Sequence, residues 1–140
     1  MRGRAGGWDT EAVQLRCVIV DDDASFLRAA ATFLEADGVT VAGVATSCAE
    51  AVARVAAVRP DVVLIDIRLG RESGFDAAAQ LAGAQLAGAA AGAGAPAVIM
   101  ISTRAAADYA DLITDSPATG FLPKAELSAA AIHRILGTSG

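Results

Sequence analysis

The stretch CVIVDDD, residues 17–23, indicates the fold class of this chain. Its first four residues are apolar and mostly β-branched, a run of the length of a short strand, and three aspartates end it. A strand without polar alternation is typical of a parallel sheet covered by helices on both faces. We therefore predict an α/β protein with acids at the carboxyl end of a buried strand.

Strand-like and helix-like segments alternate along the rest of the chain. We predict strands at Cys17–Val20, Val39–Ala45, Val62–Ile65, Ala97–Ile101 and Thr119–Leu122. We predict helices from Ser25 to about Ala36, from a capping box at Ser47 and Glu50 to about Val58, from near Gly74, from Ala105 to about Ile113, and from Glu126 to about Leu136. The third helix is expected to lose structure from Gly83, because glycines recur up to Pro96. Five strands alternating with five helices predict a doubly wound (βα)5 parallel sheet.

Composition limits the kind of protein. The chain has 140 residues, enough for one domain, which we place at residues 15–137 between a loose leader at 1–14 and a tail at 138–140. The net charge of −5 and the lack of a Lys/Arg cluster argue against nucleic-acid binding by this domain. No apolar stretch is long enough for a membrane span. The two cysteines lack metal-ligand spacing, so we expect a reduced, cytoplasmic setting.

Polar side chains follow four of the predicted strands. Asp21 and Asp22 follow the first strand and Asp66 the third, while Ser102 follows the fourth and Lys124 lies just past the fifth. The carboxyl ends of parallel strands share one edge of a sheet, where ligands bind. Carboxylates gathered there repel one another unless a cation balances them, and an oxygen-only ligand set favours Mg²⁺. With an ammonium and a hydroxyl beside the metal, the set predicts a site for a phosphoryl group.

Two neighbours of these residues have other expected roles. Asp23 fits a charge at the N-terminus of the first helix better than a metal ligand. Thr103 is the weaker candidate for the hydroxyl, because Ser102 comes directly after the strand and the other residue can cap the next helix.

The strand-end motifs together resemble the receiver domains of bacterial response regulators. They are Val-Asp-Asp at 20–22, Leu-Ile-Asp at 64–66, Ile-Ser at 101–102 and Phe-Leu-Pro-Lys at 121–124. The resemblance covers residues 16–136 and implies a flavodoxin-like sheet with strand order 2-1-3-4-5. It also implies that Asp66 accepts a phosphoryl group from a phosphohistidine of a sensor histidine kinase or phosphotransfer protein. Asp22, Asp66 and the backbone carbonyl of Arg68 would bind Mg²⁺, with Asp21 acting largely through a metal-bound water.

The same resemblance implies a switch. Lys124 would pair with one phosphoryl oxygen, Ser102 would donate a hydrogen bond to another, and Phe121 would turn inward once Ser102 moves. The surface of the fourth helix, fifth strand and fifth helix would then change, and an output partner, an attached DNA-binding domain or a second copy of the chain would read it. A plain core role for Phe121 stays open.

The sequence departs from the family pattern at three places. Gly70 stands where receivers usually carry a proline. In receivers a proline commonly follows the lysine, but here Pro123 precedes Lys124 and Ala125 follows Lys124. Without proline, a cis peptide bond between Lys124 and Ala125 would cost about 2.5–4 kcal/mol. The side chain of Arg68 could overhang the site and pair with an acid or hinder water.

Three other functions were weighed against phosphoryl signalling. A phosphohydrolase of the DxD type would need an acid where Asp66-Ile67-Arg68 has arginine, so we expect no enzymatic turnover of external substrates. A flavodoxin-like cofactor binder would place a phosphate beside three aspartates, which repel it. A pseudo-receiver that folds alike and serves as an interaction module without phosphorylation stays open.

Overall fold

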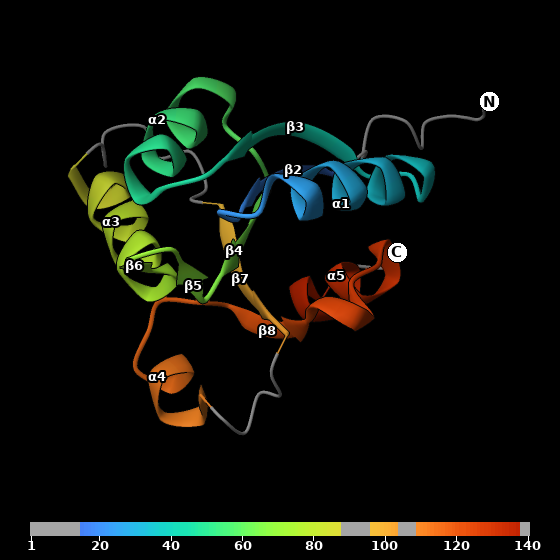
Figure 1. The fold of residues 1–140 in the computed structure, drawn as a ribbon. Coiled ribbons are helices and arrows are strands. Elements are labelled where there is room, and N and C mark those ends of the chain that lie inside the picture. The colour runs from blue at the N-terminus through green and yellow to red at the C-terminus, as the bar shows by residue number, and fades with distance from the viewer. Residues whose placement is uncertain (1–14, 88–95, 104–108, 138–140) are drawn as a thin grey trace.

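A parallel sheet forms the centre of the fold (Figure 1). The computed structural model describes residues 15–87, 96–103 and 109–137. Helices and strands are labelled as in Figure 1. One five-stranded sheet has the order β3-β2-β4-β7-β8, and every neighbouring pair in it is parallel. Its strands are β2 (Arg16–Val20), β3 (Thr40–Ala45), β4 (Val62–Asp66), β7 (Ala97–Ser102) and β8 (Gly120–Pro123). Counted along the chain this order is 2-1-3-4-5, so the predicted flavodoxin-like fold is confirmed.

Helices cover both faces of this sheet (Figure 1). One side carries α2 (Cys48–Val58) and α3 (Gly74–Ala87), and the other carries α1 (Ala24–Ala36) and α5 (Ala129–Leu136). A short α4 (Ala110–Thr114) precedes β8, and a single 3₁₀ turn, η4 (Lys124–Glu126), follows it. Across the described ranges, no helix has the length and apolar character needed to cross a bilayer.

The alternation of side chains along the inner strands divides the core in two. In β2, Val18 and Val20 pack in one cluster with residues of α2 and α3, whereas Cys17 and Ile19 pack in another with residues of α1 and α5. All of β4 is buried. An inner strand must therefore be apolar on both faces, which is why CVIV lacks the polar alternation of a surface strand.

The first two helices begin with side-chain caps. Asp23 caps α1, since its Oδ1 accepts from the backbone N–H groups of Ser25 and Phe26, so its predicted helix-terminal role is confirmed. Only half of the capping box predicted for α2 is present. Ser47 accepts from the N–H of Glu50 at 3.2 Å, but the Glu50 carboxylate turns back to the N–H and hydroxyl of Thr46.

The predicted end of the third helix was wrong. We expected structure to be lost from Gly83, but α3 continues through it to Ala87. A single glycine costs a helix only about 1 kcal/mol, and the alanines around it are the best helix formers. The proposed flexible connection up to Pro96 falls on residues 88–95, outside the described residues.

The last two helices also differ from the prediction. The described part of the fourth helix is Ala110–Thr114, and the predicted start at Ala105 lies outside the described residues. Its Leu112 is 54% exposed. The fifth helix does not begin at Glu126, because the 3₁₀ turn intervenes and Ser128 caps α5 by accepting from the N–H of Ala131.

A small hairpin after β4 was not predicted. β5 (Arg68–Leu69) pairs antiparallel with β6 (Glu72–Ser73), and Gly70 opens the turn with φ +60°. A glycine with positive φ at the first central position is typical of a type II′ hairpin turn. Glu72 anchors the hairpin to α2, because its Oε1 accepts from the N–H of Cys48 at 2.9 Å.

Candidate functional site

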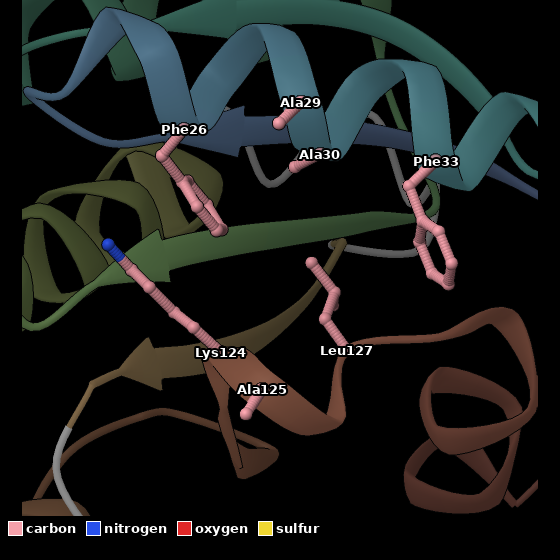
Figure 2. Close-up of a pocket in the computed structure, with 7 residues that line it drawn as sticks. All are labelled: Phe26, Ala29, Ala30, Phe33, Lys124, Ala125 and Leu127. Atoms are coloured by element: carbon pink, nitrogen blue, oxygen red, sulfur yellow. The ribbon is translucent and has the colours of Figure 1, made fainter.

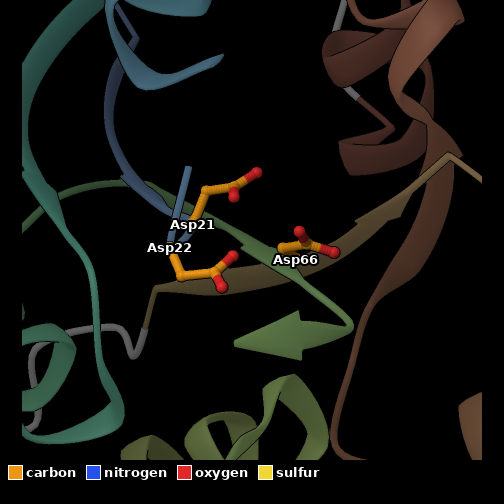
Figure 3. A group of neighbouring side chains, drawn as sticks. All are labelled: Asp21, Asp22 and Asp66. Carbon is orange, nitrogen blue, oxygen red and sulfur yellow. The ribbon is translucent and has the colours of Figure 1, made fainter. Parts of the chain in front are cut away.

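Three acids meet at the carboxyl edge of the sheet, as the sequence predicted (Figure 3). Asp21 and Asp22 follow β2, and Asp66 ends the neighbouring strand β4. One carboxylate oxygen from each of the three lies within 4.8 Å of the others. Asp21 is buried and Asp22 is exposed, so the cluster extends from the interior to the surface.

Asp21 is the inner member of this cluster. Its Oδ1 accepts from the N–H of Asp23 at 2.9 Å. Burial raises the pKa of its carboxyl, and the charge of Asp66 adds to the shift, while the contacts with Lys124 and the N–H of Asp23 oppose it. Asp21 Oδ2 is buried and lies 2.6 Å from Lys124 Nζ, with which it forms an ion pair.

Lys124 supplies the positive charge. Its Nζ lies 2.6 Å from Asp21 Oδ2 and 3.1 Å from Asp66 Oδ2, so one ammonium group bridges the ends of two strands. Burial alone would lower the pKa of Lys124, but the two carboxylates together outweigh it and the net pKa is raised. The ammonium therefore stays charged and partly offsets the repulsion between the acids.

Asp66 is held by the chain that follows it. Its Oδ1 accepts from the N–H of Arg68 at 3.2 Å, and its Oδ2 accepts from Lys124. Its backbone carbonyl lies against Gly74, where an added Cβ would overlap it. The Asp66 side chain is 13% exposed, so it is partly accessible to solvent.

The predicted hydroxyl residue lies on β7, which pairs with β4, and the predicted aromatic residue lies on β8, which pairs with β7. Ser102 ends β7 and is 3% exposed, whereas Thr103 is exposed. In β8, Phe121 pairs with Met100 of β7 and is partly buried against the α2/α3 side of the core. The switch roles of Ser102 and Phe121 stay predictions.

The departures from the family pattern have structural correlates. Gly70 adopts φ +60°, which proline cannot adopt, so the glycine is suited to the hairpin turn. A Cβ on Gly70 would lie 3.5 Å from Asp22 Oδ2, so the turn borders the acids. The described residues contain no cis peptide bond, so the Lys124–Ala125 bond is trans. The side chain of Arg68 is exposed, and the metal role of its carbonyl stays a prediction.

The acid cluster fits a divalent cation. Its ligands are all carboxylate oxygens, the kind of ligand that Mg²⁺ prefers, and they lie within 4.8 Å of one another. Asp21, Asp22 and Asp66 would hold such an ion, with water completing its coordination.

Two residues next to the site were missed by the sequence analysis. The ring of Phe26, on the first turn of α1, faces Lys124 Nζ at 4.1 Å from its centroid, and Gly74 lies against the carbonyl of Asp66. Nothing in the local sequence marks either contact, since helical periodicity assigns Phe26 to the core and Gly74 to a helix start.

The fold and the site define a class: doubly wound α/β domains with an acidic, lysine-balanced site at the carboxyl edge of the sheet. The family model of the response regulator receiver domain matches residues 17–136. The chain therefore belongs to the receiver domains of two-component response regulators.

Similarity to individual proteins agrees with this family. A 59-residue segment is 46% identical to the acid tolerance regulatory protein ActR of Sinorhizobium medicae (strain WSM419); it spans 42% of this chain and only 30% of that relative. The receiver domain of the response regulator NarL from Mycobacterium tuberculosis superimposes with a TM-score of 0.70 at 26% identity, covering 89% of this chain and 98% of that one.

A further solved structure is similar in fold alone. It is a response regulator protein from Burkholderia pseudomallei, described with a phosphorylated aspartic acid, a calcium ion and citrate. Its TM-score is 0.70 at 20% identity, over 87% of this chain and 66% of that chain.

Proposed function

We propose that Asp66 accepts a phosphoryl group from a phosphohistidine of a sensor histidine kinase or phosphotransfer protein. The observation that carries this proposal is the position of Asp66 Oδ2, 3.1 Å from the ammonium of Lys124 and within the three-acid cluster. A carboxylate that is partly exposed and balanced by a cation is a suitable nucleophile for phosphoryl transfer.

The proposed step exchanges one bond to phosphorus for another. A carboxylate oxygen of Asp66 forms the new P–O bond, the P–N bond to the histidine breaks, and its electron pair returns to the imidazole. Lys124 Nζ then contacts a phosphoryl oxygen in place of Asp66 Oδ2. A bound Mg²⁺ would neutralise further phosphoryl charge. Its ligands would be Asp21, Asp22, Asp66 and the carbonyl of Arg68.

The phosphoryl group adds negative charge and acceptor oxygens beside Ser102. Ser102 donates a hydrogen bond to one of them, and Phe121 turns into the space that Ser102 leaves. This is supported by the positions of the two residues, at the end of β7 and on the adjoining strand β8. The surface of α4, β8 and α5 then presents a different shape to an output partner, a linked DNA-binding domain or a second copy of the chain.

In this role the protein is a cytoplasmic switch, and the only chemistry that it performs is on its own Asp66. It does not turn over external substrates, and the receiver domain itself binds no nucleic acid. The arginine at position 68 supports the absence of external turnover, because a DxD phosphohydrolase would use an acid there.

Intact-mass measurement tests the proposal. The protein is incubated with Mg²⁺ and acetyl phosphate, and the expected result is the addition of one phosphoryl group. The Asp66→Asn variant is expected to gain none. Asp61→Asn is a matched control. Asp61 is an exposed acid that immediately precedes β4, whereas Asp66 lies at the carboxyl end of this strand.

Two outcomes would count against the proposal. A phosphoryl adduct that persists in Asp66→Asn would place the acceptor elsewhere. A folded wild-type protein that gains no phosphoryl group from either acetyl phosphate or a phosphorylated histidine kinase would favour the pseudo-receiver.

A further inference from the structure

The ring of Phe26 also contacts the ammonium of Lys124. Lys124 Nζ lies 4.1 Å from the centroid of the Phe26 ring, well inside the range of about 6 Å in which an aromatic face attracts a cation. Figure 2 shows the two side chains facing each other at one end of a cavity of about 260 Å³ between α1 and the segment after β8. Phe33 lines the opposite end.

Hydrogen bonds accepted by Asp21 and Asp23 position the backbone of Phe26. Asp21 Oδ1 accepts from the N–H of Asp23, and Asp23 Oδ1 accepts from the N–H of Phe26 at 3.2 Å. The ring faces Lys124, whose Nζ returns to Asp21 Oδ2 at 2.6 Å. Asp21 therefore contacts Lys124 directly and is also linked to Phe26 through Asp23. The same buried acid thus positions both the start of α1 and the ammonium.

The ring restricts the lysine without competing for its donors. A lysine stem has four flexible carbons, and its head group carries three N–H donors. The carboxylates of Asp21 and Asp66 attract the head group, while the face of Phe26 contacts it and offers no strong acceptor. The ammonium therefore keeps its donors for the acids and, after phosphorylation, for a phosphoryl oxygen.

We propose that Phe26 is a positioning residue, whose ring face holds Lys124 Nζ at Asp66 ready for the incoming phosphoryl group. This inference rests on the proposed function, since it concerns the rate of that reaction. Removal of the ring would leave the charge of Lys124 intact but let the head group spend less time at Asp66.

Three substitutions test the role of the ring. Phe26→Leu removes the ring and keeps an apolar side chain, and Phe26→Tyr keeps the ring. Phe33→Leu is the matched control, because Phe33 lies on the same helix and lines the same cavity but is 51% exposed. With acetyl phosphate and Mg²⁺, we expect the phosphorylation rate to fall about threefold to tenfold in Phe26→Leu, in line with the strength of cation–π contacts. The rate should recover in Phe26→Tyr and stay unchanged in Phe33→Leu.

A nuclear magnetic resonance measurement reads the contact directly. Protons near the face of an aromatic ring are shifted upfield, so the ε-methylene protons of Lys124 should be shifted in the wild type and in Phe26→Tyr. In Phe26→Leu they should return toward ordinary lysine values. This signal does not depend on phosphorylation and reports whether the ring lies against the head group of Lys124, while the rate measurements test whether that contact positions it.

The outcomes separate this inference from the proposed function. An unchanged rate in Phe26→Leu, or a loss that Phe26→Tyr does not restore, would overturn the positioning role. If the wild type gains no phosphoryl group, the proposed function fails. The Lys124 signal still decides whether the ring contacts the ammonium, and an unshifted signal overturns that contact.

Discussion

The backbone carbonyl of Asp66 lies against the Cα of Gly74, where any side chain at residue 74 would overlap it. The N–H of Gly74 also donates to the carbonyl of Ile67 at 2.7 Å. The first residue of α3 is thereby closely packed against the end of β4 that carries the candidate phosphoryl acceptor. Residue 74 must therefore be glycine if the backbone around Asp66 is to keep this geometry.

Gly74→Ala is expected to destabilise the protein by about 1–3 kcal/mol, the usual cost of overpacking. The added methyl meets backbone atoms, which cannot rotate away as a flexible side chain can. Urea denaturation measures the change in the free energy of unfolding. Gly83→Ala is the control in the same helix: nothing lies within 4 Å of its added Cβ, so it should stabilise by about 0.5–1 kcal/mol. Equal stability of the two variants would contradict this account.

Restoring the proline of the family pattern should harm this chain. Gly70 has φ +60°, and proline holds φ near −65°, so Gly70→Pro is expected to break the hairpin turn and to lower the free energy of unfolding by more than about 1 kcal/mol. Gly70→Asn should cost less, because asparagine tolerates turn positions with positive φ. Thermal unfolding of the three proteins checks the order; a proline variant as stable as the wild type would show that the turn has another conformation.

Loss of the Lys124 ammonium should be costly in the protein without metal. Lys124→Met leaves the buried Asp21 beside Asp66 without a counter-charge, and removing one partner of a buried pair typically costs about 3 kcal/mol or more. Lys124→Arg keeps the charge and should cost less. If the loss arises from the uncompensated acid, adding Asp21→Asn to Lys124→Met should recover part of it, as a double-mutant cycle in urea would show. Additive losses would rule out this coupling.

Magnesium should stabilise the folded protein. A ligand that binds only the folded state at 100 times its Kd adds about 2.7 kcal/mol to the free energy of unfolding. We expect Mg²⁺ to raise the melting temperature of the wild type and to have a much smaller effect on Asp22→Asn, which lacks one cluster carboxylate. Asp23→Asn should keep the full response, because Asp23 caps α1 and the amide oxygen of asparagine can still cap it. If Asp23→Asn also lost the response, the ion would be attracted by the overall negative charge of this region and not bound by the three-acid cluster.

Both cysteines should react slowly in the folded state. Burial raises the pKa of Cys17 from 9.0 to about 12 and that of Cys48 from 9.0 to about 11. At pH 8, a thiol reagent should therefore modify two thiols rapidly in denatured protein and neither rapidly in native protein. Rapid labelling of one thiol without unfolding would show that its element opens locally.

The same shifts predict how stability varies at alkaline pH. The folded pKa of each thiol lies above its unfolded value, so the folded protein favours the protonated form. This contribution to stability is complete below pH 9 and is lost as pH rises through about 11 to 12. Cys48→Ser should reduce the slope of stability against pH between 9 and 11, measured by urea denaturation. An unchanged slope would exclude Cys48 as its source.

The order of apolar runs and polar residues along the chain was enough to predict the sheet and the main members of the site. Apolar runs of strand length mark the inner strands, and a parallel order brings their carboxyl ends to one edge. Asp21, Asp22, Asp66 and Lys124 follow strands along the chain, so their meeting results from topology and needs no knowledge of packing.

The contacts between elements could not be predicted from local patterns. The ring of Phe26 under Lys124, the close approach of Gly74 to Asp66, and the hairpin anchored by Glu72 join residues whose local patterns predict nothing about one another. The end of α3 beyond Gly83 was missed for a related reason: a single residue's helix propensity is small, and the packing of a whole helix outweighs it. Periodicity reports which face of an element is buried, whereas the partner on that face depends on how close-packed elements fit together in three dimensions.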